Sequence, residues 1–290
     1  MSRIAYVNGR YVPFASAFVH VEDRGYQLAD GVYEVIAVWE GRPIDLVPHL
    51  QRLGQSLAEL RLEWPVGKQT LRTVLHSVVE RNYIRKGIVY IQISRGVYKR
   101  KHIFPPKGIR TTLVVTAHSY SLLASATLFE QGVSVITLKD LRWQRCDIKS
   151  LTLLPNVLSR QIASETGAFE AWLLASDGTI TEGTSSTAWI VTHRGHVITR
   201  PLSQALLRGI TRERVLALAN LLGIAVVERP FTLEETKHAA EAFLTSTTAF
   251  ILPVVTINGK QIQDGRPGAV TRRLRTAYLS SLTSGAAIGW

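Results

Sequence analysis

The chain has 290 residues, of which 46% are hydrophobic and 19% are charged. This balance is typical of a globular protein and excludes a mainly disordered chain, and the length predicts about two domains. Thirty-four Lys and Arg residues against 22 Asp and Glu residues give a net charge of +12, which favours anionic partners without choosing among phosphorylated cofactors, carboxylate substrates and nucleic acid.

The first part of the chain alternates short strand and helix signals. Asn8-Gly9 lies between two apolar runs and predicts a hairpin with a type I′ turn. A second hairpin is predicted over 32–46, with its turn at Glu40-Gly41. Helices are predicted after Pro48 and around 71–79, and strands over 88–94 and 111–117. These elements together predict an α+β domain over residues 1–119.

The second part predicts a larger domain. Residues 120–130 belong to a small, hydroxylated and weakly periodic segment, which predicts a connection between domains. The second domain is predicted over 131–290, with strands near 133–138, 171–175, 186–191 and 242–244, and helices near 155–166, 211–222, 232–240 and 269–282.

The cysteine count and the apolar runs limit the location. Cys146 is the only cysteine, which excludes an intrachain disulfide framework and a zinc site made of several thiolates. The first apolar run ends at Asn8, too early for a signal peptide, and no run approaches the ~18 apolar residues of a membrane-spanning helix. We therefore expect a cytoplasmic protein without a membrane partner.

Two titratable residues stand in unusual surroundings. Lys149 lies beside a nearly apolar run, which disfavours the ammonium and makes its amine a candidate Schiff-base nucleophile. Glu182 follows a turn and precedes Gly183 and a run of hydroxyl residues, so its charge can approach a flat ligand and stabilise a protonated ring nitrogen. The alternatives are a lysine that extends into solvent and an exposed hairpin glutamate.

Two further segments favour anion binding. Gly209 and Thr211 stand where a helix begins, and free N–H groups at such a position bind phosphate; Thr245 to Thr248 add hydroxyl groups after a short strand. Arg100 and His102 lie two residues apart in a basic loop, so both can point toward one carboxylate. Ordinary helix capping and a solvated basic loop are the alternatives. His193 and His196 flank a glycine turn, and we expect no metal site there.

Taken together, these segments resemble the D-amino-acid transaminases, in the group of pyridoxal-phosphate enzymes that includes the branched-chain aminotransferases and aminodeoxychorismate lyase. The resemblance covers essentially the whole chain. Its most specific stretches are 22–27, 30–35, 49–53, 142–151, 181–186 and 209–212.

The resemblance implies a role for each candidate residue. The cofactor is pyridoxal 5′-phosphate, Lys149 binds it and moves a proton between the substrate and the cofactor, and Glu182 pairs with its ring nitrogen. The groups expected to hold the phosphate and the ring are Arg52, Leu207, Gly209, Ile210, Thr211, Ser246 and Thr247. Tyr33, Arg100 and His102 match the residues that bind the substrate carboxylate, and Lys101 between the last two is more basic than the family pattern.

The resemblance also implies an architecture and a reaction. We expect fold type IV: a small α+β domain and a larger pseudo-barrel domain, with the cofactor in the crevice between them, in a homodimer whose partner loop can complete the carboxylate site. The expected reaction moves the amino group of a D-amino acid such as D-alanine to 2-oxoglutarate, giving a 2-oxo acid and D-glutamate. The alternatives are a branched-chain L-aminotransferase, an (R)-selective amine transaminase, aminodeoxychorismate lyase and, from another class, a basic nucleic-acid-binding protein, for which the sequence has no recognised motif.

Overall fold

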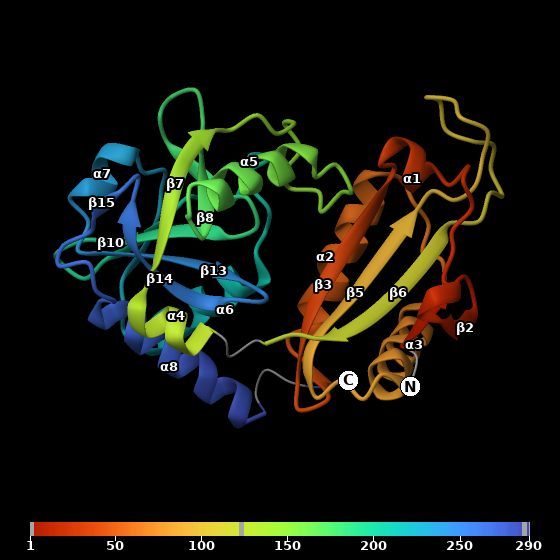
Figure 1. Cartoon of the computed structure of the whole chain (residues 1–290), viewed down its shortest axis with the longest axis horizontal. Helices are drawn as coiled ribbons and strands as arrows, with labels where there is room; N and C mark the ends of the chain where they lie inside the picture. Colours follow the sequence, from red (N-terminus) through yellow and green to blue (C-terminus); the bar gives the residue numbers. More distant parts are fainter. Residues whose placement is uncertain (1–2, 122–124, 286–288, 290) are drawn as a thin grey trace. The chain divides into compact units, whose positions relative to one another are not determined.

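The computed structural model describes residues 3–121, 125–285 and 289 (Figure 1). The chain divides into two compact units. The described residues of unit 1 fall within Met1–Leu122, Ile148–Thr152 and Gly285–Trp290, and those of unit 2 within Leu123–Asp147 and Leu153–Ser284. The sequence placed Ile148–Thr152 in the second domain, whereas here this segment belongs to unit 1, because it pairs with a strand of that unit through a bridge between Val32 and Ser150.

Unit 1 contains an antiparallel sheet with the strand order β2-β1-β6-β5-β3-β4. Its strands are β1 (Ile4–Val7), β2 (Arg10–Pro13), β3 (Gly31–Trp39), β4 (Arg42–Pro43), β5 (Lys86–Ser94) and β6 (Thr112–Ser119). Both predicted hairpins are present, and Asn8-Gly9 and Glu40-Gly41 have positive φ at both turn residues, as a type I′ turn requires.

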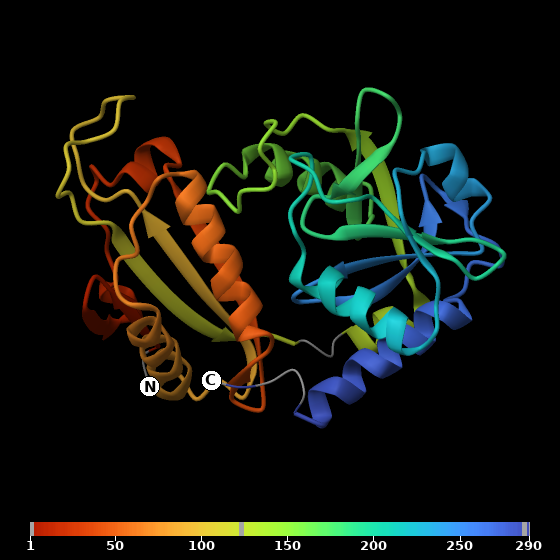
Figure 2. The ribbon, with the colours of Figure 1, turned by 180° about the vertical axis from the view of Figure 1, so that it is seen from behind.

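Helices α2 (Leu46–Glu59) and α3 (Lys68–Arg81) cover one face of this sheet (Figure 2). The short η1 (Phe14–Ser16) and α1 (Arg24–Leu28) precede them in the chain. The apolar side chains of α2 recur at Leu46, Leu50, Leu53 and Leu57, all buried. This helical spacing puts them on one face, which packs with α3 and the buried side of β3, β5 and β6 in a single apolar core.

Unit 2 contains a mixed sheet with the strand order β12-β11-β10-β13-β14-β7-β8-β9, and β15 pairs with β14. The strands are β7 (Val133–Lys139), β8 (Glu170–Leu174), β9 (Ile180–Gly183), β10 (Thr187–Val191), β11 (Val197–Thr199), β12 (Val226–Glu228), β13 (Glu241–Ser246), β14 (Phe250–Ile257) and β15 (Lys260–Gln261). Strand β7 runs steeply across β10 and β13, so the sheet is strongly curled (Figure 1).

The helices of unit 2 are α4 (Ser125–Gln131), α5 (Leu154–Glu165), α6 (Ile210–Leu221), α7 (Leu233–Lys237) and α8 (Ala269–Thr283). Helices α6 and α8 pack on each other and on β13 and β14. Residues 125–131 form α4, whereas the sequence predicted a connection over 120–130; residues 122–124 lie outside the described part. The predicted helix 232–240 is shorter, and α7 ends at Lys237. In the described residues, no helix is long and apolar enough to cross a membrane.

Candidate active site

Lys149 lies on a short segment that extends the edge of the unit 1 sheet. Its carbonyl accepts a hydrogen bond from the Tyr33 N–H at 3.0 Å, and the Leu151 N–H donates to the Gly31 carbonyl at 3.0 Å. The Lys149 N–H donates to Ser56 Oγ on α2 at 3.1 Å. Both sides of the lysine backbone are therefore fixed, and its Nζ lies 4.3 Å from the centre of the Tyr33 ring. Two predicted site residues, Lys149 and Tyr33, are thus brought together.

Tyr33 is part of a small polar group on the sheet face that α2 and α3 do not cover. Its ring lies 5.8 Å from that of Tyr90 across β3 and β5, and the Tyr90 hydroxyl donates to Gln92 Oε1 at 2.7 Å. Burial and the neighbouring Tyr33 raise the pKa of Tyr90 to about 12. Tyr90 therefore keeps its phenolic proton at neutral pH and serves as a hydrogen-bond donor beside Tyr33.

Arg52, which the resemblance assigns to the phosphate, is bonded to a buried carboxylate. Its Nε and Nη2 donate to the two oxygens of Glu34 at 2.7 and 2.8 Å, and His49 Nδ1 lies 2.8 Å from Glu34 Oε2. All three side chains are buried between α2 and β3. Burial raises the pKa of Glu34, but the opposing effects of Arg52 and His49 leave it well below its ordinary value. Glu34 is therefore an ionised internal anchor for Arg52, which the sequence analysis did not identify.

Arg100 and His102 lie on an exposed loop that follows β5 and extends beyond the end of the sheet (Figure 1). Both side chains are exposed. Tyr33 pairs with Gln92 within the sheet, before the loop begins. The three residues predicted to bind the substrate carboxylate thus divide into one residue on the sheet and two on this loop.

Glu182 is buried at the end of β9 in unit 2 and forms an ion pair with Arg142. The Leu207 N–H also donates to its two oxygens, at 3.2 and 3.3 Å. Burial raises the pKa of Glu182, and the positive charge of Arg142 limits that rise. Because an arginine is protonated at neutral pH, its contact favours the charged form of the carboxylate beside it.

Arg142 is itself held by Asp140, through bonds from Nη2 at 2.8 Å and Nε at 3.0 Å. The Thr181 hydroxyl donates to the same Asp140 carboxylate at 2.7 Å. Burial disfavours the Arg142 charge, but the Asp140 bond and the Glu182 charge outweigh it and raise the Arg142 pKa. No local pattern in the sequence indicated a role for Arg142, since only its two acidic contacts in the folded chain reveal one.

A second buried carboxylate, Glu170, organises the hydroxyl run that follows Glu182. Its oxygens accept hydrogen bonds from the Thr184 hydroxyl, from Ser185 Oγ at 3.2 Å and from Ser186 Oγ at 3.0 Å. At Gly183 an added Cβ would collide with Ser186 Oγ, so a larger residue would push that hydroxyl away from its place beside Glu170. Glu170 was also missed, although a run of hydroxyl groups indicates a need for a nearby acceptor.

The predicted phosphate groups of unit 2 gather at one place. Gly209 precedes α6, no side chain caps the helix, and Ile210 and Thr211 are buried in its first turn. A Cβ at Gly209 would lie 3.0 Å from Thr187 Oγ1, and Thr187 pairs with Thr245, directly before Ser246 and Thr247. The uncapped helix start and the turn after β13 are therefore neighbours. This arrangement suits a phosphate, because N–H groups and the helix dipole both favour an anion.

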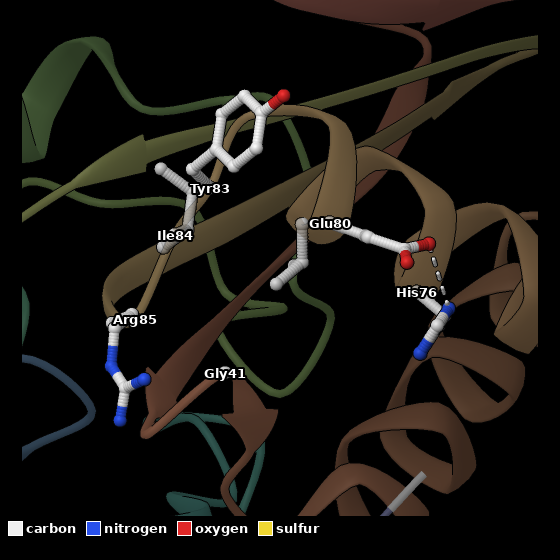
Figure 3. Close-up of a pocket in the computed structure, with 7 residues that line it drawn as sticks. Gly41, His76, Glu80, Tyr83, Ile84 and Arg85 are labelled. Carbon is white, nitrogen blue, oxygen red and sulfur yellow. Dashed lines mark ion pairs between the residues drawn. The ribbon is translucent and has the colours of Figure 1, made fainter.

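One pocket of unit 1 lies away from all of these residues (Figure 3). It is lined by Gly41, His76, Val79, Glu80, Tyr83, Ile84 and Arg85, between the β3–β4 turn and the end of α3. It contains no predicted site residue. Within the described ranges, no three His, Cys, Asp or Glu side chains are grouped to hold a metal ion. His193 lies on the surface, where its Nε2 is 3.3 Å from Gln263 Nε2.

An enzyme that handles amines through a phosphorylated ring cofactor needs an amine, a carboxylate for the ring nitrogen and an anion site. Each of these is present in one unit or the other, which indicates that class. The family model for class IV amino-transferases matches residues 31–257. The chain therefore belongs to the class IV aminotransferase family, whose cofactor is pyridoxal 5′-phosphate, as the sequence predicted.

Full-length relatives agree with this membership. A D-alanine aminotransferase of Bacillus licheniformis is 41% identical over 277 residues, which cover 96% of each chain. A D-alanine aminotransferase of Listeria monocytogenes serotype 4b (strain F2365) is 38% identical over 95% of each chain.

Solved structures confirm the predicted fold type IV. A branched-chain amino acid aminotransferase of T.th., solved with pyridoxamine 5′-phosphate, has a TM-score of 0.91 and 26% identity, covering 100% of this chain and 99% of that one. The branched-chain amino acid aminotransferase from Escherichia coli has a TM-score of 0.87 and 26% identity, covering 97% and 94%. The chain thus has the fold of these aminotransferases.

Proposed function

We propose that this protein is a D-amino-acid transaminase. It transfers the amino group of a D-amino acid such as D-alanine to its cofactor and then to 2-oxoglutarate, which gives D-glutamate. The observation that carries this choice of substrate is the 41% identity, across 96% of both chains, to a protein named D-alanine aminotransferase. The branched-chain aminotransferases among the solved structures are more distant, at 26% identity.

When bound, pyridoxal phosphate supplies an aldehyde that reacts with amines and a ring that accepts electrons from the substrate α-carbon. Lys149 Nζ would hold the cofactor through that aldehyde. The same amine would act as the general base and acid that moves a proton from and to the substrate. The two backbone bonds of Lys149, to Tyr33 and to Ser56, hold the amine in place for both transfers.

Glu182 is the residue that we assign to the ring nitrogen. Arg142 and the Leu207 N–H occupy only part of the about four acceptor sites of a carboxylate, so Glu182 can accept one more hydrogen bond. Its negative charge would favour a proton on that nitrogen, and a protonated ring withdraws electrons most strongly. Asp140 supports this role by fixing the orientation of Arg142.

The phosphate fits the uncapped start of α6. The groups that would bind it are the N–H groups of Ile210 and Thr211 and the hydroxyl of Thr247, with Ser246 nearby. Gly209 has no side chain, so the phosphate can come close to the backbone there. Leu207 would pack on the ring. Arg52 remains a proposed phosphate ligand; its bonds to Glu34 on one side keep its guanidinium rigid.

Tyr33, Arg100 and His102 are proposed to bind the substrate carboxylate. Because the loop with Arg100 and His102 leaves the sheet beyond Tyr33, we propose that it serves the site of a partner subunit. Arginine and carboxylate form charge-assisted bonds, so this loop favours amino acids over amines without a carboxylate.

The test is to compare amino donors with the purified holoenzyme. D-alanine, L-leucine and an (R)-aryl amine are each supplied with 2-oxoglutarate, and the chirality of the glutamate is determined. The proposal expects D-alanine to be the fastest donor and D-glutamate to be the product. A faster reaction with L-leucine, giving L-glutamate, would instead identify a branched-chain aminotransferase.

We further propose a homodimer. Helix α5 exposes Leu154, Val157, Leu158 and Ile162, which are 67%, 57%, 57% and 44% accessible. Their helical spacing forms one apolar stripe, and such stripes on a surface indicate an interface. In unit 1, Phe18, Val21 and Tyr26 are exposed as well. We also propose a cytoplasmic location. Cys146 is the only cysteine of the chain, so the fold needs no oxidising compartment to form disulfides.

Sedimentation velocity tests the dimer. Wild type is expected to sediment as a dimer, and Leu158→Glu as a monomer, since a charge in an apolar interface is costly. Leu221→Glu changes an exposed leucine on α6 outside the stripe and should leave the dimer intact. A wild-type monomer at micromolar concentration would refute this part of the proposal.

A further inference from the structure

The basic loop, residues 97–104, carries Arg100 and His102 on an exposed path. The side chains of 99–104 are all exposed, so packing of these side chains does little to fix the loop. Its start is held by a bridge between Asp23 and Val97 and by the Tyr98 N–H, which donates to the Glu22 carbonyl at 3.2 Å. Farther along, it is attached to the body of unit 1 at the Lys101 carbonyl and at the Phe104 ring. Both contacts are made by arginines, and both arginines are bonded to the same oxygen of one carboxylate.

The first arginine is Arg24. Its Nη1 donates to the Lys101 carbonyl at 2.6 Å, and its Nε donates to Asp30 Oδ2 at 2.8 Å. The side chain is buried, and its own N–H donates to the Gly96 carbonyl at 2.9 Å. The backbone around it is fixed because Asp23 caps α1 by accepting from the Gly25 N–H at 2.8 Å. Arg24 is therefore a rigid arm from the body of the unit to the loop.

The second arginine is Arg95, at the point where the loop leaves β5. Its Nε donates to the same Asp30 Oδ2 at 2.8 Å, and its Nη2 donates to the Leu60 carbonyl at 2.8 Å. Its guanidinium carbon lies 3.7 Å from the centre of the Phe104 ring, as in a cation–π contact. Arg95 therefore holds the far end of the loop while Arg24 holds its middle.

Asp30 connects the two arginines, because both of them donate to its Oδ2 atom. Burial raises its pKa, but the bonds and charges of Arg95 and Arg24 outweigh burial and leave the pKa below its ordinary value. The Asp30 carboxylate is thus ionised at neutral pH, and its bonds to both guanidinium groups are charge-assisted. Loss of either arginine leaves the other without part of its support.

The bonded carbonyl belongs to Lys101, which lies between the two residues proposed to bind the substrate. The chain bends at Arg100 and at His102, on either side of Lys101. Fixing the peptide of Lys101 therefore restrains the backbone that carries both residues. Without that bond, both side chains would have to be ordered by the substrate itself, which weakens binding.

We propose that Arg24, supported by Asp30 and assisted by Arg95, is a positioning residue that sets the affinity for the substrate carboxylate by holding the basic loop. This inference rests on the proposed function of Arg100 and His102. In this proposal, three residues outside the reacting centre control the specificity for amino acids. Arg24 contacts neither the substrate nor the cofactor in this proposal.

The experiment uses the holoenzyme with Arg24→Met, which keeps most of the side-chain length and removes both bonds. The first measurement is the single-turnover reaction with D-alanine, followed by the loss of the absorbance of the lysine-bound cofactor. The concentration for half-maximal rate should rise roughly 10- to 100-fold, the range for one lost charge-assisted bond, with a maximal rate within about threefold of wild type. For Arg24→Lys, which keeps a cation beside Asp30, the concentration for half-maximal rate should lie between the values of wild type and Arg24→Met.

The second measurement is cleavage by trypsin, which cuts after Lys99, Arg100 and Lys101. Arg24→Met should be cut in the loop at least about tenfold faster than wild type, because cleavage follows the open population. The matched control is Arg275→Met, which removes another buried arginine that donates to a backbone carbonyl, Ile251, in unit 2. It should leave the loop and the response to D-alanine unchanged.

The outcomes separate the two proposals. If wild type does not react with D-alanine, the proposed function fails, and trypsin still decides whether Arg24 holds the loop. If wild type reacts and Arg24→Met matches it in both measurements, this inference is overturned. Should Arg24→Met fail to fold, Arg24→Lys replaces it, because it keeps a cation beside Asp30 but cannot donate to Asp30 and to the Lys101 carbonyl in the same planar geometry. Unchanged cleavage and D-alanine response in that variant equally overturn the inference.

Discussion

Replacement of Arg52 by methionine tests the buried group of Glu34, His49 and Arg52. Glu34 is completely buried, and Arg52 supplies two of its hydrogen bonds, at 2.7 and 2.8 Å. Removing one partner of a buried ion pair leaves the other charge uncompensated and costs about 3 to 5 kcal/mol. For a chain of this size, that loss corresponds to a decrease in Tm of about 6 to 20 °C.

The effect should depend on pH in a defined direction. In wild type the pKa of Glu34 lies below its ordinary value, so its contribution is present above the unfolded pKa of about 4.3 and is lost as the pH falls below it. In Arg52→Met, only His49 still opposes the effect of burial, so the pKa of Glu34 rises. That variant loses stability as the pH increases, so the difference from wild type should be largest at about pH 7 and smaller near about pH 4.

Chemical unfolding of the cofactor-free protein, followed by far-UV circular dichroism, measures these differences. The matched control is Arg85→Met, which breaks the exposed pair with Glu40 and should leave the stability nearly unchanged. The double variant Glu34→Gln and Arg52→Met removes both charges, and should be more stable than Arg52→Met alone. A loss below about 1 kcal/mol for Arg52→Met at neutral pH would refute the reasoning, because a buried charge cannot be left unpaired so cheaply.

Three further predictions concern the reaction. Lys149→Ala should abolish turnover and the absorbance of the lysine-bound cofactor while the phosphate contacts still bind the cofactor; full steady-state activity would exclude the assignment. Glu182→Gln should slow α-proton removal much more than it weakens cofactor binding, and an equal kcat at saturating cofactor would make Glu182 an ordinary buried residue. Arg100→Ala should lower kcat/KM for D-alanine by roughly 10- to 100-fold, and the half-reaction of an (R)-aryl amine less; equal losses would indicate a role in folding or cofactor binding.

Local patterns predicted much of unit 1. Asn8-Gly9 and Glu40-Gly41 identified both hairpins, since only a few residue types accept the positive φ of such turns. No strand was predicted over β14. Pro253 interrupts its apolar run, and a proline demotes a predicted strand, yet β14 pairs with β7 and β13 on its two sides. The pairing of neighbouring strands overrides the local signal there.

The candidate site shows a similar limit. Glu34 alternates with Val32 and Ile36 in one strand, so the sequence already places a carboxylate on an apolar face. Its partner Arg52 is found only when α2 packs on β3. In the same way, Arg142 and Glu170 gain their roles from contacts between segments distant in sequence, which no local pattern contains. Residue type and spacing identify candidate groups, and tertiary packing identifies what supports them.

The edge of β3 also has a consequence for the order in which the chain folds during synthesis. The Tyr33 N–H and the Gly31 carbonyl are completed by residues 149–151, although the rest of their sheet ends at Ser119. A ribosome must therefore add the first segment of unit 2 before the sheet of unit 1 can close. Until then that edge is open to pairing with other chains. The segment that brings Lys149 to its place is thus the last part of the unit 1 sheet to be made.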